Sequence, residues 1–370
     1  MKVLFLYADS EKEYNCSHWR SYLPSTFLNR FAGWETALYP IKDVGNLLGS
    51  SIIENVDILF VERLLSSELF MWLDIIRAQT GAKIIFDMDD SYKNMEYGSQ
   101  PYDFWINGII QSNKGKPRMH YPPIEQIGWY SKNVDAISSP SKLILEDWKE
   151  YNDNLLWLPN FADADLYTKI PYRDDDKVTI GWGGGATHYT SWYASGLITA
   201  LRRIFTSFKG KVSLLLITGD KQLQNKLREF NPKIVHTDQL LYPKEIHDID
   251  IALAPVCGEY DRRRSWLKIS EYSLSAIPWV GSDLDPYREY NFPGSILVRN
   301  KPADWYDALA EMIENRLKYY SEAQEKGYPL WRKAFAIQEN YEFLASQFSS
   351  VKETKCQYQP VQQGKSFLTW

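Results

Sequence analysis

The chain has 370 residues, which is more than one hydrophobic core usually covers, so we expect two domains. Hydrophobic residues make up 44% and charged residues 24% of the sequence, an ordinary composition for a globular protein. The net charge of −5 and the pI of about 5.7 argue against nucleic acid as a partner, because nucleic-acid-binding proteins usually carry a basic surface.

The three cysteines, Cys16, Cys257 and Cys356, lie far apart and form no Cys-x-x-Cys pair. We therefore expect neither a zinc site nor a disulfide framework, and a reducing compartment, the cytoplasm, is the expected location. The opening MKVLFLYADS predicts a buried strand rather than a signal peptide. No run approaches the roughly 18 apolar residues of a membrane span, so any association with the inner face of a membrane would be peripheral.

Short runs of β-branched and aliphatic residues recur along the chain and predict strands that are buried on both faces. A first series occupies residues 2–7, 57–61, 83–87, 134–138 and 155–158. A second series occupies residues 178–182, 211–217, 233–236, 250–254, 278–281 and 296–298. Helical patterns lie between the strands, as in residues 191–208 and 303–320, where apolar residues recur at a spacing of 3.6. This alternation predicts parallel sheets with crossover helices.

The two series of strands predict an α/β protein with two Rossmann-like domains that face each other across a cleft. We place the first domain at residues 1–165 and the second at 166–330, with the polar stretch 168–177 as a linker. Residues 331–370 are expected to form a terminal helix and a tail that pack back on the first domain. Ligands of such sheets bind at the carboxyl ends of the strands.

A glycine-rich turn, IGWGGGATH, opens the second domain at residues 180–188. Gly183, Gly184 and Gly185 follow a predicted strand and precede a helix, where bare backbone N–H groups can approach an anion closely. The turn is neither Gly-x-Gly-x-x-Gly nor a P-loop, so it does not specify NAD or ATP. Its alternative explanation is a tight turn that needs a positive φ. His188, just beyond the glycines, either starts the helix in solvent or points into the cleft toward a sugar or phosphate.

A second polar cluster follows the strand at residues 250–254. Lys268 and Glu271 are three residues apart and share one helix face. The ammonium group could neutralise a diphosphate, and the carboxylate could accept hydrogen bonds from the hydroxyls of a ribose. The alternative is a surface ion pair worth only a few tenths of a kcal/mol.

These motifs together resemble those of glycosyltransferases with the GT-B fold, of the retaining family 4 type. WLKISEYSLSAIPWVGSD, at residues 266–283, is similar to their donor-binding stretch, in which a Glu is followed seven residues later by a Pro. The glycine turn is similar to a Gly-x-x-x-Thr-His turn of one branch of these enzymes. LPNFAD, at 158–163, resembles their interdomain segment, and IIFDMDD, at 84–90, is similar to an Asp-x-Asp-Asp strand end.

The resemblance implies an enzyme that transfers a sugar from a nucleoside-diphosphate donor, which is its substrate, and that requires no cofactor and no metal. Its implied site residues fall into two groups. The catalytic residues are His188, Lys268 and Arg264, and the donor-binding residues are Gly183, Gly184, Gly185, Glu271, Ser265 and Ser282. The sequence departs from the family at Arg263, where many members have a first Glu, and at Ala276, where they have a Gly.

The first domain is expected to bind the acceptor, a glycan or another molecule. Its candidate residues are His18, Arg20, Asp87 and Asp90, with Arg63 as a weaker candidate. Arg20 could bind an acidic or phosphorylated acceptor. The alternative is that Arg20 is an exposed charge on a loop without a role in binding. The acids of DMDD have the oxygen ligands that suit Mg²⁺, but Asp-x-Asp metal sites belong to the single-domain glycosyltransferase fold, so no metal is predicted.

Three other functions stay open at this point. A nucleotide-sugar epimerase would bind the same donor and release free nucleotide. A binding subunit without catalysis is favoured by Arg263 in place of Glu. A DNA-base glycosyltransferase is disfavoured by the net negative charge.

Overall fold

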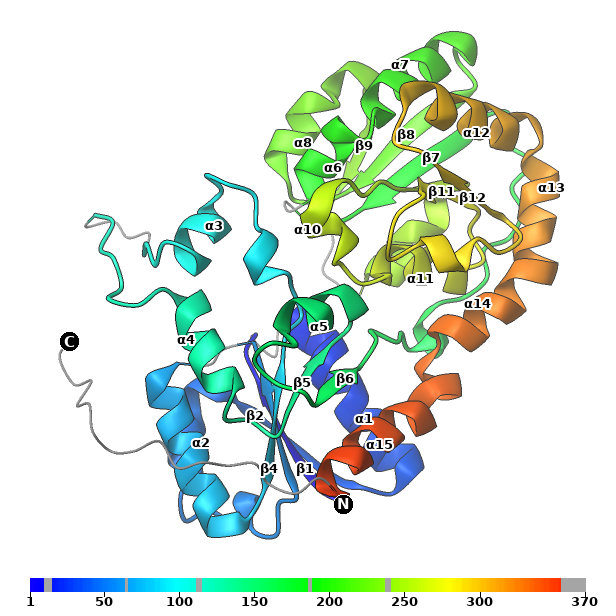
Figure 1. Cartoon of the computed structure of the whole chain (residues 1–370). Coiled ribbons are helices and arrows are strands. Elements are labelled where there is room, and N and C mark those ends of the chain that lie inside the picture. Colours follow the sequence, from blue (N-terminus) through cyan, green and yellow to red (C-terminus); the bar gives the residue numbers. More distant parts are fainter. Residues whose placement is uncertain (10–14, 64–65, 111–114, 186–187, 237–240, 354–370) are drawn as a thin grey trace.

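The computed structural model of the chain describes residues 1–9, 15–63, 66–110, 115–185, 188–236 and 241–353. Two parallel sheets of six strands dominate it, one in each half of the chain (Figure 1). The strands of the first sheet are β1 (Lys2–Tyr7), β2 (Glu35–Pro40), β3 (Ile58–Glu62), β4 (Lys83–Asp87), β5 (Ala136–Ser139) and β6 (Leu155–Trp157). Those of the second are β7 (Val178–Gly183), β8 (Val212–Ile217), β9 (Lys233–Val235), β10 (Ile251–Ala254), β11 (Trp279–Ser282) and β12 (Ser295–Val298).

Helices connect these strands. The α-helices of the first half are α1 (Leu23–Ala32), α2 (Ser67–Thr80), α3 (Gln100–Trp105), α4 (Pro123–Ser131) and α5 (Lys142–Trp148). Those that follow are α6 (Tyr189–Ala194), α7 (Leu197–Ser207), α8 (Lys221–Lys226), α9 (Tyr242–Glu245), α10 (Gly258–Arg262), α11 (Leu267–Leu274), α12 (Pro302–Glu314), α13 (Arg316–Ser321), α14 (Tyr328–Phe335) and α15 (Ile337–Glu353). Two π-helical segments lie at His18–Tyr22 and Glu322–Gly327, and short 3₁₀ segments at Ile41–Leu47, Ser51–Ile53, Tyr92–Asn94, Ala164–Leu166, Arg228–Phe230, Ile246–Asp248 and Arg288–Tyr290.

The strand order of each sheet fixes where a ligand can bind. The first sheet runs β2-β1-β3-β4-β5-β6 and the second β12-β11-β10-β7-β8-β9. In each sheet the chain adds strands first toward one edge and then toward the other. The change falls between β1 and β3 in the first sheet and between β7 and β10 in the second. A crevice opens outside the carboxyl ends of the strands at such a switch point, and ligands of doubly wound sheets bind there. The predicted fold class is confirmed.

The inner strands of each sheet are buried on both faces, as every residue of β3, β5, β10 and β11 is, so helices cover both sides of each sheet. One face of the first sheet packs on α2, α4 and α5, and one face of the second packs on α7 and α12. The other two faces share a single core, which includes residues of α1, α11, α14 and α15. The two domains are therefore joined by a continuous apolar layer.

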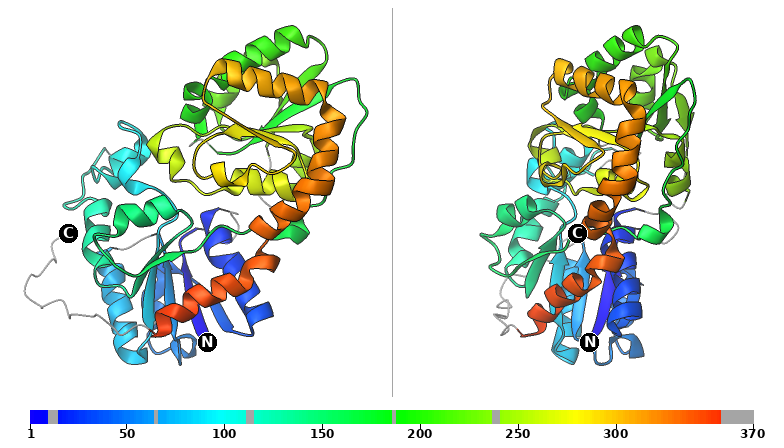
Figure 2. Two further views of the ribbon diagram at one scale, coloured as in Figure 1. Left: turned by 45° about the vertical axis from the view of Figure 1, so that its right-hand side comes forward. Right: turned by 90° about the vertical axis from the view of Figure 1, so that its right-hand side faces the viewer.

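The end of the chain returns to the first domain. Figure 2 shows the orange and red helices running along one side of the molecule, from the second domain down to the first. Helix α15 lies against α1, and its Phe348 packs on Phe5 and Phe60 with ring centroids 5.8 and 5.6 Å apart. Residues 354–370, the predicted tail, lie outside the described residues.

The structure differs from the sequence prediction in a few elements. Strand β2 was not predicted, because it lies at the edge of its sheet, is only partly buried and ends in Pro40. The helix predicted over 191–208 is two helices, since Gly196 adopts a φ of 82° between α6 and α7. The terminal helix is likewise divided at Ala336, whose extended backbone pairs with Ala162.

Candidate active site

The carboxyl ends of both sheets face one cleft, and polar contacts cross it. The Tyr260 hydroxyl donates to Asp90 at 2.5 Å, and Arg263 donates to Asp147 through Nε at 2.6 Å and a second nitrogen at 3.1 Å. Arg263 thus holds the second domain against α5 of the first. Sequence reasoning missed this contact, because Asp147 is far away in the chain.

The glycine turn ends β7, and each of its glycines has a different environment. A Cβ on Gly183 would lie 2.4 Å from the Tyr242 ring, and one on Gly184 would lie 2.6 Å from the Trp182 ring. Neither has a positive φ, so close packing, and not backbone strain, requires glycine there.

The backbone amides of these two glycines are already bound. The N–H of Gly183 donates to the Tyr272 hydroxyl at 3.2 Å, and that of Gly184 donates to the Ile217 carbonyl at 3.1 Å. Gly185 is the exposed member of the turn, with open space where a Cβ would stand. Of the three, Gly185 is the one whose backbone a ligand can reach. Ala186 and Thr187, which complete the predicted turn, lie outside the described residues.

His188 is buried at the start of α6, so it is not a solvated helix-start residue. Its Nε2 lies 3.1 Å from a guanidinium nitrogen of Arg264. An arginine can only donate, so Nε2 accepts and the neutral ring carries its proton on Nδ1. Burial, with Arg264 and Lys268 nearby, lowers the pKa of His188 well below its usual value. Nδ1 is buried and has no hydrogen-bond partner among the described residues.

Arg264 is held in place by Asp261, a carboxylate that sequence reasoning missed. The Nε of Arg264 donates to Asp261 at 2.8 Å, and the other oxygen of Asp261 accepts from Ser191 at 2.5 Å and from the Cys257 amide at 2.8 Å. Asp261 therefore connects the start of α6 with α10. Its signal in the sequence was the i,i+3 spacing to Arg264.

Lys268 and Glu271 form the predicted pair on one face of α11, at 3.0 Å. This is not a surface ion pair, since the side chains are only 17% and 4% exposed. Burial raises the pKa of Glu271, and Lys268 opposes that shift. The Lys268 ammonium lies 5.1 Å from the centre of the Tyr242 ring, which also packs on Gly183. The glycine turn and the Lys268–Glu271 pair therefore lie side by side.

The two serines predicted for the donor site have different environments. Ser282 is fully buried, donates to Asn300 at 2.7 Å and accepts from the Val256 amide at 3.0 Å. Its position favours support of the loop after β10 over direct contact with a ligand. Ser265 is half-buried in the connection between α10 and α11.

Arg20 and Asp87 were predicted to face the acceptor, and the structure corrects this. Arg20 is 2% exposed and forms a bidentate ion pair with Asp87, with contacts of 2.8 and 2.6 Å. Its remaining donors reach the Leu158 carbonyl and, at 2.7 Å, the side chain of Asn160. Asp87 is fully buried and also accepts from Ser138 at 2.6 Å. The pair fixes the segment that leads into the second domain.

The other two acceptor-side candidates have different environments. His18 is buried against Trp19, and burial lowers its pKa to about 3, so it is neutral at pH 7. Asp90 accepts the Tyr260 hydroxyl, and burial raises its pKa while Arg264 opposes the shift. Asp90 is thus the acidic residue of the first domain that stands opposite Arg264.

A cluster of charges occupies the switch point of the first sheet. Arg63, after β3, contacts Asp9 at 2.6 Å, Glu62 at 3.2 Å and Asp89 at 3.5 Å. Its φ is +63°, a conformation that costs energy for any residue but glycine and is often found at functional sites. Among the described residues, no group of three or more His, Cys, Asp or Glu side chains could hold a metal ion.

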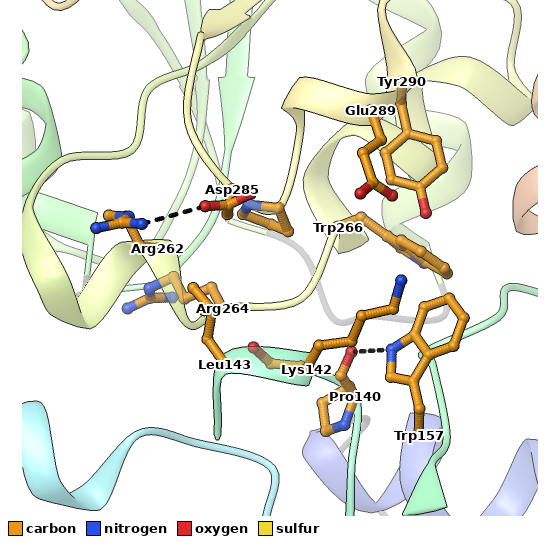
Figure 3. Close-up of a pocket in the computed structure, with 12 residues that line it drawn as sticks. Pro140, Lys142, Leu143, Trp157, Arg262, Arg264, Trp266, Asp285, Glu289 and Tyr290 are labelled. Carbon is orange, nitrogen blue, oxygen red and sulfur yellow. Dashed lines mark hydrogen bonds and ion pairs between the residues drawn. The ribbon is translucent and has the colours of Figure 1, made fainter. Parts of the chain in front are cut away.

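A cavity of about 210 Å³, which we call the interdomain pocket, opens beside Arg264 (Figure 3). The first domain contributes Lys142 and Trp157, and the second contributes Arg262, Arg264 and Trp266 together with the loop after β11.

No helix in the described ranges is both long and apolar enough to cross a membrane. Cys16 and Cys257 are free thiols, and Cys356 lies outside the described residues.

Two doubly wound domains that meet at such a cleft define the GT-B fold of glycosyltransferases. The structure of HepE from Anabaena, solved with UDP and glucose, has a TM-score of 0.63 at 11% identity, over 95% of this chain and 100% of that chain. A glycosyltransferase from Rickettsia africae gives 0.62 at 12% identity, over 96% and 99%. A putative UDP-N-acetylglucosamine 2-epimerase from Listeria monocytogenes gives 0.53 at 11% identity, over 96% and 98%.

These likenesses are in structure only. Neither a protein-family model nor a curated protein matches the sequence of this chain. At 11–12% identity the neighbours show a shared GT-B fold. The predicted GT-B architecture is thereby confirmed.

Proposed function

We propose that this chain is a glycosyltransferase that moves a sugar from a nucleoside-diphosphate donor to an acceptor, without a catalytic metal. The observation that carries the proposal is the set of cations at the switch point of the second sheet. Arg264 contacts the buried, neutral His188 at 3.1 Å, and Lys268 lies close enough to the same ring to help lower its pKa. The backbone N–H of His188 donates to the carbonyl of the exposed Gly185 at 3.4 Å. Cations that are partly removed from solvent bind the negative charges of a diphosphate strongly.

The chemistry of transfer explains the arrangement. When the bond between the sugar and the phosphate breaks, negative charge develops on the leaving diphosphate. Preorganised cations and hydrogen-bond donors stabilise that charge, and they do so more strongly out of water. In the proposal, Arg264 and Lys268 supply the charge, and the Nδ1–H of His188 donates to the diphosphate or to the sugar. The cations take the place that a metal holds in other glycosyltransferases.

Glu271 completes the donor site in this proposal. Its carboxylate lies 3.0 Å from Lys268, so one helix offers both a cation for the diphosphate and an acceptor for the ribose hydroxyls. HepE was solved with UDP and with UDP-glucose, which supports a donor of this class. We also propose retention of configuration, which the sequence resemblance supports, and the anomeric proton signal of the product would test it by NMR.

The first experiment is a thermal shift assay with UDP, GDP, ADP, TDP and their sugar conjugates. We expect one nucleotide to raise the melting temperature, because a ligand that binds only the folded state stabilises it. In Lys268→Gln the affinity should fall about tenfold or more, the loss expected for one hydrogen bond to a charged group.

Lys318→Gln is the matched control, since Lys318 also pairs with a glutamate but is exposed on α13. It should bind the nucleotide as the wild type does. If no nucleotide shifts the melting temperature, or if Lys268→Gln binds as tightly as Lys318→Gln, the proposed donor site is wrong.

An epimerase is the second candidate, and the Listeria neighbour supports it. An epimerase converts the donor alone, whereas a transferase needs an acceptor to form a glycoside. Incubation of the purified protein with the nucleotide sugar that binds, followed by NMR of the sugar ring, separates the two. A change of configuration within the sugar, without any acceptor, would favour the epimerase.

A further inference from the structure

The interdomain pocket lies apart from the Lys268–Glu271 pair but adjoins the proposed site of transfer. Arg264 belongs to the wall of the pocket and also contacts His188 at 3.1 Å. One side of the pocket is the start of α5, after β5, and the other is the loop after β11. Both are carboxyl ends of strands, where ligands of such sheets bind. A group in this pocket would therefore stand next to the leaving diphosphate.

The size and walls of the pocket suit one sugar ring. Its volume of about 210 Å³ is below the roughly 300 Å³ at which pockets for drug-sized ligands begin, and it suits a group of the size of one sugar ring. Trp157 and Trp266 form aromatic walls, with ring centroids 5.9 Å apart. An aromatic face can cover the apolar C–H face of a sugar ring, while the hydroxyls remain free for polar partners.

The unpaired charge of Lys142 favours an anionic substituent on that ring. Figure 3 shows the ammonium group of Lys142 reaching into the pocket, and it lies 4.3 Å from the centre of the Trp157 ring. Arg262 is paired with Glu259 at 3.0 Å and with Asp285 of the pocket wall at 3.4 Å, and Arg264 is paired with Asp261 at 2.8 Å. Lys142 forms no ion pair with any described residue, so its charge is the one left for a ligand. Glu289, on the opposite wall, can accept from sugar hydroxyls.

We infer that the interdomain pocket binds an acidic sugar, a hexose ring that carries a carboxylate or a phosphate, as part of the acceptor. The inference rests on the proposed function, because it takes the neighbouring Arg264 as part of the donor site. Lys142 would move off the Trp157 ring to bind the anionic group, and Trp157 would then cover one face of the sugar ring. The acidic group, and not the ring alone, would then select the acceptor.

Three probes test this by NMR titration of the full chain. Methyl glucuronide carries a carboxylate, glucose 6-phosphate carries a phosphate, and methyl glucoside is neutral. We expect at least one of the acidic probes to bind at millimolar concentration and more tightly than methyl glucoside. The phosphate titration is repeated with UDP present, so that binding at the donor site is not mistaken for binding in the pocket.

Variants at Lys142 assign the binding to this pocket. Lys142→Gln should weaken binding of the acidic probe about tenfold, the loss expected for one charge-assisted hydrogen bond, and Lys142→Arg should restore it. Lys149→Gln is the matched control, because Lys149 is an exposed lysine at the far end of α5. It should leave binding unchanged.

The inference is overturned if no probe binds, if methyl glucoside binds as tightly as the acidic sugars, or if Lys142→Gln changes nothing. Binding of glucose 6-phosphate alone would support it and identify the acidic group as a phosphate. Failure of the donor site is a separate result, since UDP binding to wild type and Lys142→Gln is measured in the same samples.

Discussion

Glu62 is a carboxyl group enclosed at the end of β3, with no exposed surface. It accepts from Ser17 at 2.9 Å and from Ser21 at 3.0 Å. Burial, reinforced by Asp89, raises the pKa of Glu62 to about 7, although Arg63 opposes the shift. The folded protein therefore holds this proton over a range of pH in which the unfolded chain has already released it.

This difference predicts the direction of a pH effect. Below the ordinary pKa of 4.5 both states are protonated, and between 4.5 and about 7 only the folded state is. Folding is therefore disfavoured progressively as the pH rises through that range, by at most about 1.4 kcal/mol per pH unit. Glu62→Gln cannot ionise; its amide oxygen accepts from one serine, and its NH2 group donates to the hydroxyl of the other. We expect the free energy of unfolding of Glu62→Gln, relative to that of wild type, to increase as the pH rises from 4.5 to about 7.

Urea denaturation of both proteins across this range measures the effect. Glu125→Gln serves as a control, because Glu125 lies in the first turn of α4 and outside this cluster. A constant difference between wild type and Glu62→Gln at every pH would show that Glu62 titrates normally.

Sequence reasoning predicted contacts that depend on local spacing. Lys268 and Glu271 are one helical turn apart, so their pairing follows from the geometry of α11 alone. Arg20 and Asp87 are 67 residues apart, and their pairing depends on how β4 packs against the segment before α1. A lone arginine in a polar loop gives no sign of such a partner, which is why Arg20 was assigned to the acceptor.

Among the secondary-structure elements, the interruption between α6 and α7 depends on one glycine. Gly196 has a φ of 82°, and a Cβ there would lie 2.7 Å from the side chain and 2.9 Å from the backbone nitrogen of Pro302. In Gly196→Ala the alanine would adopt a left-handed conformation, and its Cβ would clash with Pro302 at the start of α12. Gly210 has a similar φ of 78°, but open space surrounds it.

The two glycines make a matched pair. Gly210→Ala should lose about 1 kcal/mol of stability, the cost of a left-handed conformation for alanine. Gly196→Ala should lose roughly 1–3 kcal/mol more, because α12 must shift to relieve the contact. Chemical denaturation of the two variants gives both values. Equal losses would mean that Pro302 moves away without cost.

The strands were predicted better than the ends of the helices, for a physical reason. A strand buried on both faces is a short apolar run, visible in the sequence wherever a turn bounds it. Strand β2 lacks that run, because one of its sides is open and its residues are partly exposed. The break at Ala336 leaves no mark in the sequence, since it depends on pairing with Ala162 of the distant interdomain segment.

For the whole molecule, the relative position of the two domains depends on contacts across the cleft. Arg263 and Asp147 are 15% and 17% exposed and bind each other through two hydrogen bonds. A bidentate, partly desolvated pair of this kind is stronger than an ordinary surface ion pair. We expect Arg263→Ala to increase the population of open conformations.

Small-angle scattering measures this as a larger radius of gyration for Arg263→Ala than for wild type. The charge-swapped variant with Arg263→Asp and Asp147→Arg should recover part of the compact population. Arg202→Ala is the control, because the Arg202–Glu229 pair is exposed within the second domain. Identical scattering from all of these variants would show that the apolar core alone sets the domain positions.

Helix α15 has a consequence for how the protein is made. It packs on α1, and its Phe348 contacts Phe5 and Phe60, so it covers a face of the first sheet. The first domain emerges from the ribosome long before α15 has been synthesised. The aromatic face that α15 covers therefore stays exposed while the second domain is translated. The half of the chain that is made first is therefore completed last, and a nascent chain halted before α15 would be a natural client for a chaperone.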